Sequence, residues 1–152
     1  MYNYHIKLVW ADIEMKLSAR NKFIGKVTDV TRGAVNGIVK VELSNGQHLT
    51  SSITLESIDD LDITVGKEVT AVIKATSVLI GRGHLTLSAR NKLSGTIIEI
   101  NRGAVNAIVK VELPSKVVIT SSISLEAVDE LDLTVGTEAT AIIKATDVLL
   151  MA

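Results

Sequence analysis

The chain has 152 residues, with 16 basic and 17 acidic side chains, one proline and no cysteine, so its formal net charge is -1. The lack of cysteine excludes disulfide scaffolds, zinc fingers, iron–sulfur sites and thiol nucleophiles. Apolar residues make up 47% of the chain but aromatic residues only 3%, and an aliphatic composition of this kind favours β-strands. No apolar run is long enough to span a membrane, and the first residues lack a signal-peptide pattern, so a cytoplasmic protein is expected.

From residue 21 onwards the sequence predicts short strands with one small helix between them. Alternation is clearest in 35–43, where Val39, Val41 and Leu43 share one face. A glycine within the first strand, Gly25, suggests a bend or a bulge there, and Thr54 is placed to cap the helix. The expected strands are 21–32, 35–43, 47–53, 69–75 and 77–80, and the expected helix is 55–61.

The second half of the chain repeats the first. LSARNK at 17–22 returns at 87–92, RGAVN at 32–36 returns at 102–106, and IKAT at 73–76 returns at 143–146. Aligning 17–81 with 87–151 needs no gap, and 39 of the 65 positions are identical. A repeat this strong means that one structural unit is used twice.

Five short strands with a helix after the third are typical of a small Greek-key barrel of the oligonucleotide/oligosaccharide-binding (OB) type. The sequence therefore predicts an all-β protein with one short helix per module, built as two tandem five-stranded OB barrels. The expected divisions are an N-terminal extension at 1–14, a first barrel at 15–81, a linker at 82–86 and a second barrel at 87–152. Barrels this small leave much apolar surface to bury, which favours association with other copies.

Several chemistries find no support in the sequence. None of the three histidines is kept in both copies, so a duplicated histidine site is not expected. The sequence lacks a nucleophile elbow, a phosphate-binding glycine loop and a dinucleotide fingerprint, so we do not expect an enzyme. Single-stranded nucleic-acid binders use a basic groove with aromatic platforms, whereas the two repeats contain one aromatic residue, Phe23.

What both copies do keep is a set of hydrogen-bond donors. A small multivalent oxyanion presents only acceptor oxygens, so a site for it needs N–H and O–H donors on every side. The alternative is that the charged members lie on an ordinary wet surface and that the hydroxyls only cap strands. The duplicated donors are Ser18, Arg20, Asn21, Thr50, Ser51, Ser52, Lys74 and Thr76, with Ser88, Arg90, Asn91, Thr120, Ser121, Ser122, Lys144 and Thr146 in the second copy.

The motifs LSARNK, GAVN, VKVEL, TSSIxLE and VGxExTAxIKAT together resemble the molybdenum-pterin-binding protein (Mop) family, the molbindins. They are similar also to the transport-associated barrels of molybdate transporter ATPases and molybdate-responsive regulators. The resemblance covers both repeats. It implies a double-module protein that binds molybdate or tungstate as its ligand, without a catalytic cofactor and without metal ligation by side chains. It further implies a homo-oligomer, expected to be a trimer, with sites at module or subunit boundaries.

Carried over residue by residue, the resemblance assigns an oxyanion-binding set and a second class of oxyanion site in the GAVN turn. Thr76 and Thr146 depart from the serine found at this position in many members. The oxyanion-binding set is Ser18, Arg20, Thr50, Ser51, Ser52, Lys74, Ala75 and Thr76, and Ser88, Arg90, Thr120, Ser121, Ser122, Lys144, Ala145 and Thr146. The second class comprises Val35, Asn36, Val105 and Asn106.

The main hypothesis is therefore a cytoplasmic molybdate- or tungstate-binding protein that serves molybdenum storage and homeostasis. One alternative is a molybdate-responsive sensor that engages a partner, for which the aromatic residues Tyr2, Tyr4 and Trp10 of the N-terminal extension are candidates. A more distant alternative is a nucleic-acid-binding barrel. Neither nucleic acid nor a membrane is expected as a partner.

Overall fold

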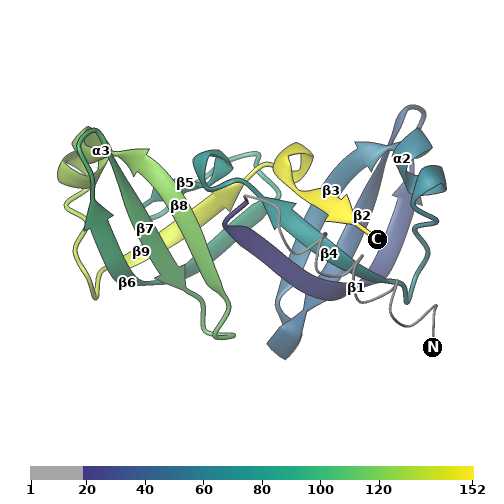
Figure 1. The fold of residues 1–152 in the computed structure, drawn as a ribbon, viewed down its shortest axis with the longest axis horizontal. Helices are drawn as coiled ribbons and strands as arrows, with labels where there is room; N and C mark the ends of the chain where they lie inside the picture. The colour runs from purple at the N-terminus through teal and green to yellow at the C-terminus, as the bar shows by residue number, and fades with distance from the viewer. Residues whose placement is uncertain (1–18) are drawn as a thin grey trace, which may run out of the picture.

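The computed structural model describes residues 19–152, so the N-terminal extension and Ser18 lie outside the described residues. The chain forms two small β-barrels that lie side by side along the long axis of the molecule (Figure 1). The first half contains β1 (Asn21–Arg32), β2 (Asn36–Leu43), β3 (His48–Thr54), α2 (Leu55–Asp60), β4 (Glu68–Ile73) and β5 (Leu79–Gly81), with short 3₁₀ turns η1 (Ser44–Gly46) and η2 (Ala75–Ser77).

The second half repeats this order almost residue for residue. It contains β6 (Asn91–Arg102), β7 (Asn106–Glu112), β8 (Val118–Ser124), α3 (Leu125–Glu130), β9 (Glu138–Ile143), η3 (Ala145–Asp147) and β10 (Leu149–Met151). The all-β class, the two modules and the helix after the third strand of each are therefore confirmed.

The two modules exchange their fifth strands. One sheet has the order β10-β4-β1-β2-β3 and the other β5-β9-β6-β7-β8. Leu149 to Met151 pair with Val72 to Thr70 of the first module, and Leu79 to Gly81 pair with Ile142 to Thr140 of the second. Figure 1 shows the yellow C-terminal strand lying within the first barrel. The barrels in space consequently differ from the contiguous repeats, because each lacks its own last strand.

Each barrel is filled by the aliphatic side chains that the alternation predicts. In β2, Val39, Val41 and Leu43 are buried while Lys40 and Glu42 are exposed. Ile58 of α2 and Val128 of α3 are buried in the same way and close one end of each barrel. Burial of apolar surface is the main stabilising term, and the equivalent residues of both repeats contribute to it.

The local signals for the helix and turns are largely borne out. The Ser57 N–H donates to the Thr54 side-chain oxygen at 3.0 Å, and Ser124 caps α3 in the same way at 3.1 Å. In the hairpin between β2 and β3, Asn45 and Gly46 both adopt positive φ, which these residue types tolerate.

Two local expectations need correction. The irregularity of β1 lies between Val27 and Asp29 rather than at Gly25. Gly25 serves a close approach instead, since a Cβ there would lie 2.6 Å from the Glu42 carbonyl oxygen. The sequence also predicted strands at 69–75 and 77–80, whereas β4 ends at Ile73 and the 3₁₀ turn η2 precedes β5. The turn redirects the chain out of its own barrel toward the other module.

Candidate functional site

Two cavities of about 420 Å³ each lie where the modules meet. We call them the Arg20 cavity and the Arg90 cavity. The Arg20 cavity is lined by Ala19, Arg20, Val72, Lys74, Ala75 and Thr76 together with Ile108, Ser122 and Leu149. The Arg90 cavity is lined by Leu87, Ser88, Ala89, Arg90, Ile142, Lys144, Ala145 and Thr146 together with Ile38, Ser52 and Leu79. The two are related by the sequence repeat.

Sheet register brings the two cationic side chains of each cavity together. Asn21 at the start of β1 pairs with Ile73 at the end of β4. Arg20 precedes the first of these residues and Lys74 follows the second, so the antiparallel pair places both at the same end of the sheet. The equivalent pairing of Asn91 with Ile143 places Arg90 beside Lys144. Two neighbouring strands thereby bring together an arginine and a lysine that are more than fifty residues apart in the sequence.

The opposite wall of each cavity carries a hydroxyl from the other module. Ser122 of β8 lines the Arg20 cavity, and Ser52 of β3 lines the Arg90 cavity. Each cavity is therefore complete only because the two modules pack against each other. The resemblance implied sites at module or subunit boundaries; here the Arg and Lys positions of each cavity come from one sheet, and the serine comes from the other module. That these residues bind an oxyanion stays a prediction.

A buried asparagine fixes the modules in this arrangement. Thr50 N–H donates to the Asn91 side-chain oxygen at 2.8 Å, and the Asn91 side-chain amide donates to the Thr50 carbonyl at 2.8 Å. Asn21 forms the same pair of bonds with the backbone of Thr120, also at 2.8 Å each. Each asparagine directly follows the arginine of a cavity, so the clamp and the cavity are built from consecutive residues.

The middle serine of each Thr-Ser-Ser segment (50–52 and 120–122) does not face a cavity. The Ser51 hydroxyl donates to the Val148 carbonyl at 2.6 Å, and the Ser121 hydroxyl donates to the Val78 carbonyl at 2.6 Å. Both serines are fully buried. Alternation along the strand turns Ser51 away from the face that Ser52 occupies. The hydroxyls of Ser51 and Ser121 therefore hold the exchanged strand segments and do not line the cavities.

The remaining predicted residues fall outside the two cavities. Thr50 and Thr120 contribute their backbone to the asparagine clamps. Val35 lies in the turn before β2 with its side chain 73% exposed, and its carbonyl accepts from Leu55 N–H at 3.0 Å. Val105 is equally exposed, and Asn36 and Asn106 lie at the same turns. The second class of oxyanion site in these turns stays a prediction.

The cavity linings offer donors and cations, and none of the lining residues is a carboxylate. Arginine and lysine supply charged N–H groups, and the serine and threonine hydroxyls supply O–H groups. A cavity of similar volume on the second barrel, lined by Ser94, Thr96, Glu138 and Thr140 among others, contains no cationic side chain. Within residues 19–152, no group of three or more His, Asp and Glu residues is placed to hold a metal ion. The junction cavities are thus suited to a small anion.

Sequence reasoning missed the asparagine clamp and the strand exchange. It counted Asn21 and Asn91 among the donors available to a ligand, whereas they are 1% and 3% exposed and bind backbone of the other module. The duplication of the asparagine was the available signal. Nothing in the sequence showed whether the asparagine side chains bind a ligand or the backbone of the other module.

The fold and the site define a class of protein: a tandem pair of OB-type barrels with strand exchange and a cationic, hydroxyl-lined cavity at each module junction. Residues 17–80 and 87–150 each match the family described as TOBE domain. The chain belongs to this family, and its resemblance to the molybdenum-pterin-binding proteins is confirmed by the relatives below.

Among its relatives is the molybdenum-pterin-binding protein MopA of Rhodobacter capsulatus, which is 36% identical over 95% of this chain and 55% of its own length. The molybdenum transport protein ModE of Herbaspirillum seropedicae is 35% identical over 88% of this chain and 50% of its own length. The chain thus spans about half the length of these curated relatives. A solved structure of the cytoplasmic molybdate-binding protein ModG with molybdate bound is 47% identical, covers 90% of this chain and 98% of its own, and superposes with a TM-score of 0.86.

Proposed function

We propose that this protein binds molybdate or tungstate in the two junction cavities and serves molybdenum storage and homeostasis. The observation that carries the proposal is the convergence of an arginine, a lysine and hydroxyls from two modules on each cavity. A tetrahedral dianion has acceptor oxygens on all sides, and these donors match it. A protonated phosphate would place its own proton against one of the donors and is expected to bind less well.

The similarity to ModG, which is described as a cytoplasmic molybdate-binding protein, supports the same ligand and the same compartment for this chain. In the part of the chain that is described, no helix is long and apolar enough to cross a membrane. The Mop and ModG relatives are named as binding proteins rather than as enzymes, and we propose that this chain likewise catalyses no reaction.

Calorimetry with molybdate, tungstate, sulfate and phosphate tests the ligand. We expect tight binding of the first two and weak binding of the others. Replacement of Arg20 and Arg90 by alanine is expected to lower molybdate affinity at least tenfold, because each cavity loses a multidentate charged donor. Arg32→Ala is the matched control, since Arg32 pairs with Asp59 at 3.0 Å on the exposed surface. Equal binding of all four anions, or an unchanged affinity of the double variant, would refute the proposal.

We infer further that the protein assembles into a homotrimer. Large exposed apolar side chains recur at equivalent positions of the two repeats: Val35 and Val105, Val65 and Val135, and Leu79 and Leu149. The two leucines lie on the rims of the Arg90 and Arg20 cavities. A repeated apolar surface of this kind is typical of an interface between copies.

Sedimentation equilibrium tests the assembly. The intact chain is expected to sediment with three times the mass of one chain. Val35→Lys combined with Val105→Lys is expected to shift the distribution toward monomer, because a lysine cannot be buried in an apolar contact without a partner. Lys40→Glu, an exposed change on β2, serves as a control for the altered charge. A monomer at micromolar concentration would disprove the inference.

A further inference from the structure

The two junction cavities differ in charge at one position just outside their walls. Residue 77 is serine beside the Arg20 cavity, and its counterpart beside the Arg90 cavity is Asp147. Both residues are half-buried and end a short 3₁₀ turn that begins directly after the cavity lysine. At this position, therefore, only the Arg90 cavity has a negatively charged neighbour.

The backbone around this position is the same in both modules. Ser77 N–H donates to the Lys74 carbonyl at 2.9 Å, and Asp147 N–H donates to the Lys144 carbonyl at 2.9 Å. Lys74 and Lys144 precede the turns with nearly equal backbone angles, φ -69 and ψ 139 against φ -66 and ψ 141. The cavity volumes are equal as well. The difference between Ser77 and Asp147 thus changes the charge near the cavity, while the backbone around the cavity and the cavity volume stay the same.

Asp147 directly follows Thr146, which lines the Arg90 cavity. Neighbouring Cα atoms lie about 3.8 Å apart, so the charged residue is one position from the cavity wall. A negative charge at this position repels a dianion in the cavity and offsets part of the attraction exerted by Lys144. The lysines that follow shortly after the cavity arginines in the sequence, Lys22 and Lys92, are the same in both copies, so they do not offset the difference at this position.

We propose that Asp147 makes the two cavities unequal, so that the Arg20 cavity binds the dianion more tightly than the Arg90 cavity. This inference rests on the proposed function of the cavities. It gives one chain two affinities for the same ligand, which widens the concentration range over which the protein takes up and releases the anion.

One other difference between the cavities must be separated from the charge. Val72 in the wall of the Arg20 cavity is replaced by Ile142 in the Arg90 cavity. A steric effect of one methylene group does not depend on salt, whereas repulsion between Asp147 and the anion is screened as the Debye length falls from about 10 Å at 0.1 M salt to about 3 Å at 1 M. Salt dependence therefore distinguishes the two causes.

The experiment compares single-cavity variants of the full chain by calorimetry with molybdate. Arg90→Ala leaves the Arg20 cavity intact, and Arg20→Ala leaves the Arg90 cavity intact. We expect the first variant to bind about 3- to 10-fold more tightly at low salt, with the gap narrowing in 1 M salt. The same ratio is expected with tungstate, because the effect comes from charge and not from size.

Substitution at the two turn positions completes the test. Asp147→Asn in the Arg20→Ala background is expected to close most of the gap while preserving shape. Ser77→Asp in the Arg90→Ala background is expected to weaken binding by a similar factor. Equal affinities of the two cavities, or a gap that persists in Asp147→Asn and in high salt, would overturn the inference while leaving the proposed function standing. Failure of every variant and of the unsubstituted chain to bind molybdate would instead refute the proposed function.

Discussion

At the module junction, each of three consecutive residues, Thr50, Ser51 and Ser52, has a different role. Thr50 gives its backbone to the asparagine clamp, Ser51 holds a carbonyl of the other module, and Ser52 lines a cavity. The division follows from the strand geometry, because neighbouring side chains point to opposite faces. A serine that looks like a ligand donor in the sequence is thus a structural residue when its face is turned inward.

Ser51→Ala and Ser52→Ala should therefore have opposite effects. Loss of the Ser51 hydroxyl leaves the buried Val148 carbonyl without this donor and is expected to cost about 1–3 kcal/mol of unfolding free energy, with little change in anion affinity. Ser52→Ala is expected to leave stability nearly unchanged and to weaken binding in the Arg90 cavity. Urea unfolding and calorimetry on the same two proteins measure both effects. Equal loss of affinity in the two variants would contradict the assignment.

The exchanged strands β5 and β10 are the elements that join the two barrels. Each is only three residues long, yet each pairs along the edge of the other module's sheet and completes its barrel. In this arrangement neither repeat forms a full barrel from its own contiguous segment. The 3₁₀ turns η2 and η3 are the points at which the chain leaves its own module.

Removal of residues 149–152 should consequently damage the distant half of the chain. Without β10, the edge of β4 loses its partner, and we expect faster hydrogen exchange in β4 of the first module than in β9 of the second. Deletion of Ala152 alone is the control, because it lies beyond β10. Greater loss of protection in β9 than in β4 would show that the exchanged pairing is wrong.

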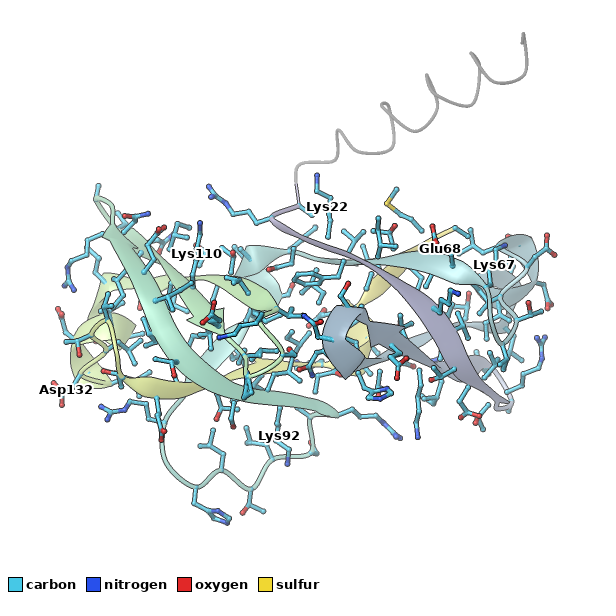
Figure 2. The ribbon with its side chains drawn as sticks, turned by 90° about the horizontal axis from the view of Figure 1, so that it is seen from below. Lys22, Lys67, Glu68, Lys92, Lys110 and Asp132 are labelled. Atoms are coloured by element: carbon cyan, nitrogen blue, oxygen red, sulfur yellow. The ribbon has the colours of Figure 1, made fainter. Side chains whose placement is uncertain are left out.

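The molecule as a whole is held together by more than its linker. Two asparagine clamps, two buried serine bonds and two exchanged strands join the modules. The linker itself is anchored, since Arg82 donates to the Leu131 carbonyl at 2.9 Å just after α3. The turn that follows α3 lies far from the junction, and Figure 2 shows Asp132 of this turn and Lys67 of the first module at opposite ends of the molecule.

Cleavage of the linker should therefore leave the two halves associated. A protease site introduced after Gly83, which is exposed and has φ +77, is expected to yield two fragments that elute together in gel filtration and separate only in denaturant. The uncut protein with the same insertion controls for the altered linker. Separation of the fragments in native buffer at micromolar concentration would mean that the junction contacts are weak.

The sequence by itself determined the repeat, the number and order of strands, the Thr54 helix cap and the aliphatic core. Each of these depends on local periodicity or on identity between the two copies, as with Val39 and Val41 in β2 or the Thr54 cap. It also pointed to Arg20, Lys74 and their twins, because their side chains are the donors that an oxyanion needs. Near-zero net charge did not argue against such a ligand, since a few converging donors suffice.

Only the tertiary structure decided which barrel each fifth strand completes and which donors face the cavities. A strand of three residues carries the same pattern in either barrel, so its partner is chosen by long-range packing and by the turn before it. Whether Asn21, Ser51 and Ser52 contact the other module or line a cavity depends likewise on how the modules pack. The hydrogen bonds of Asn21 and Ser51 join residues about a hundred positions apart in the sequence.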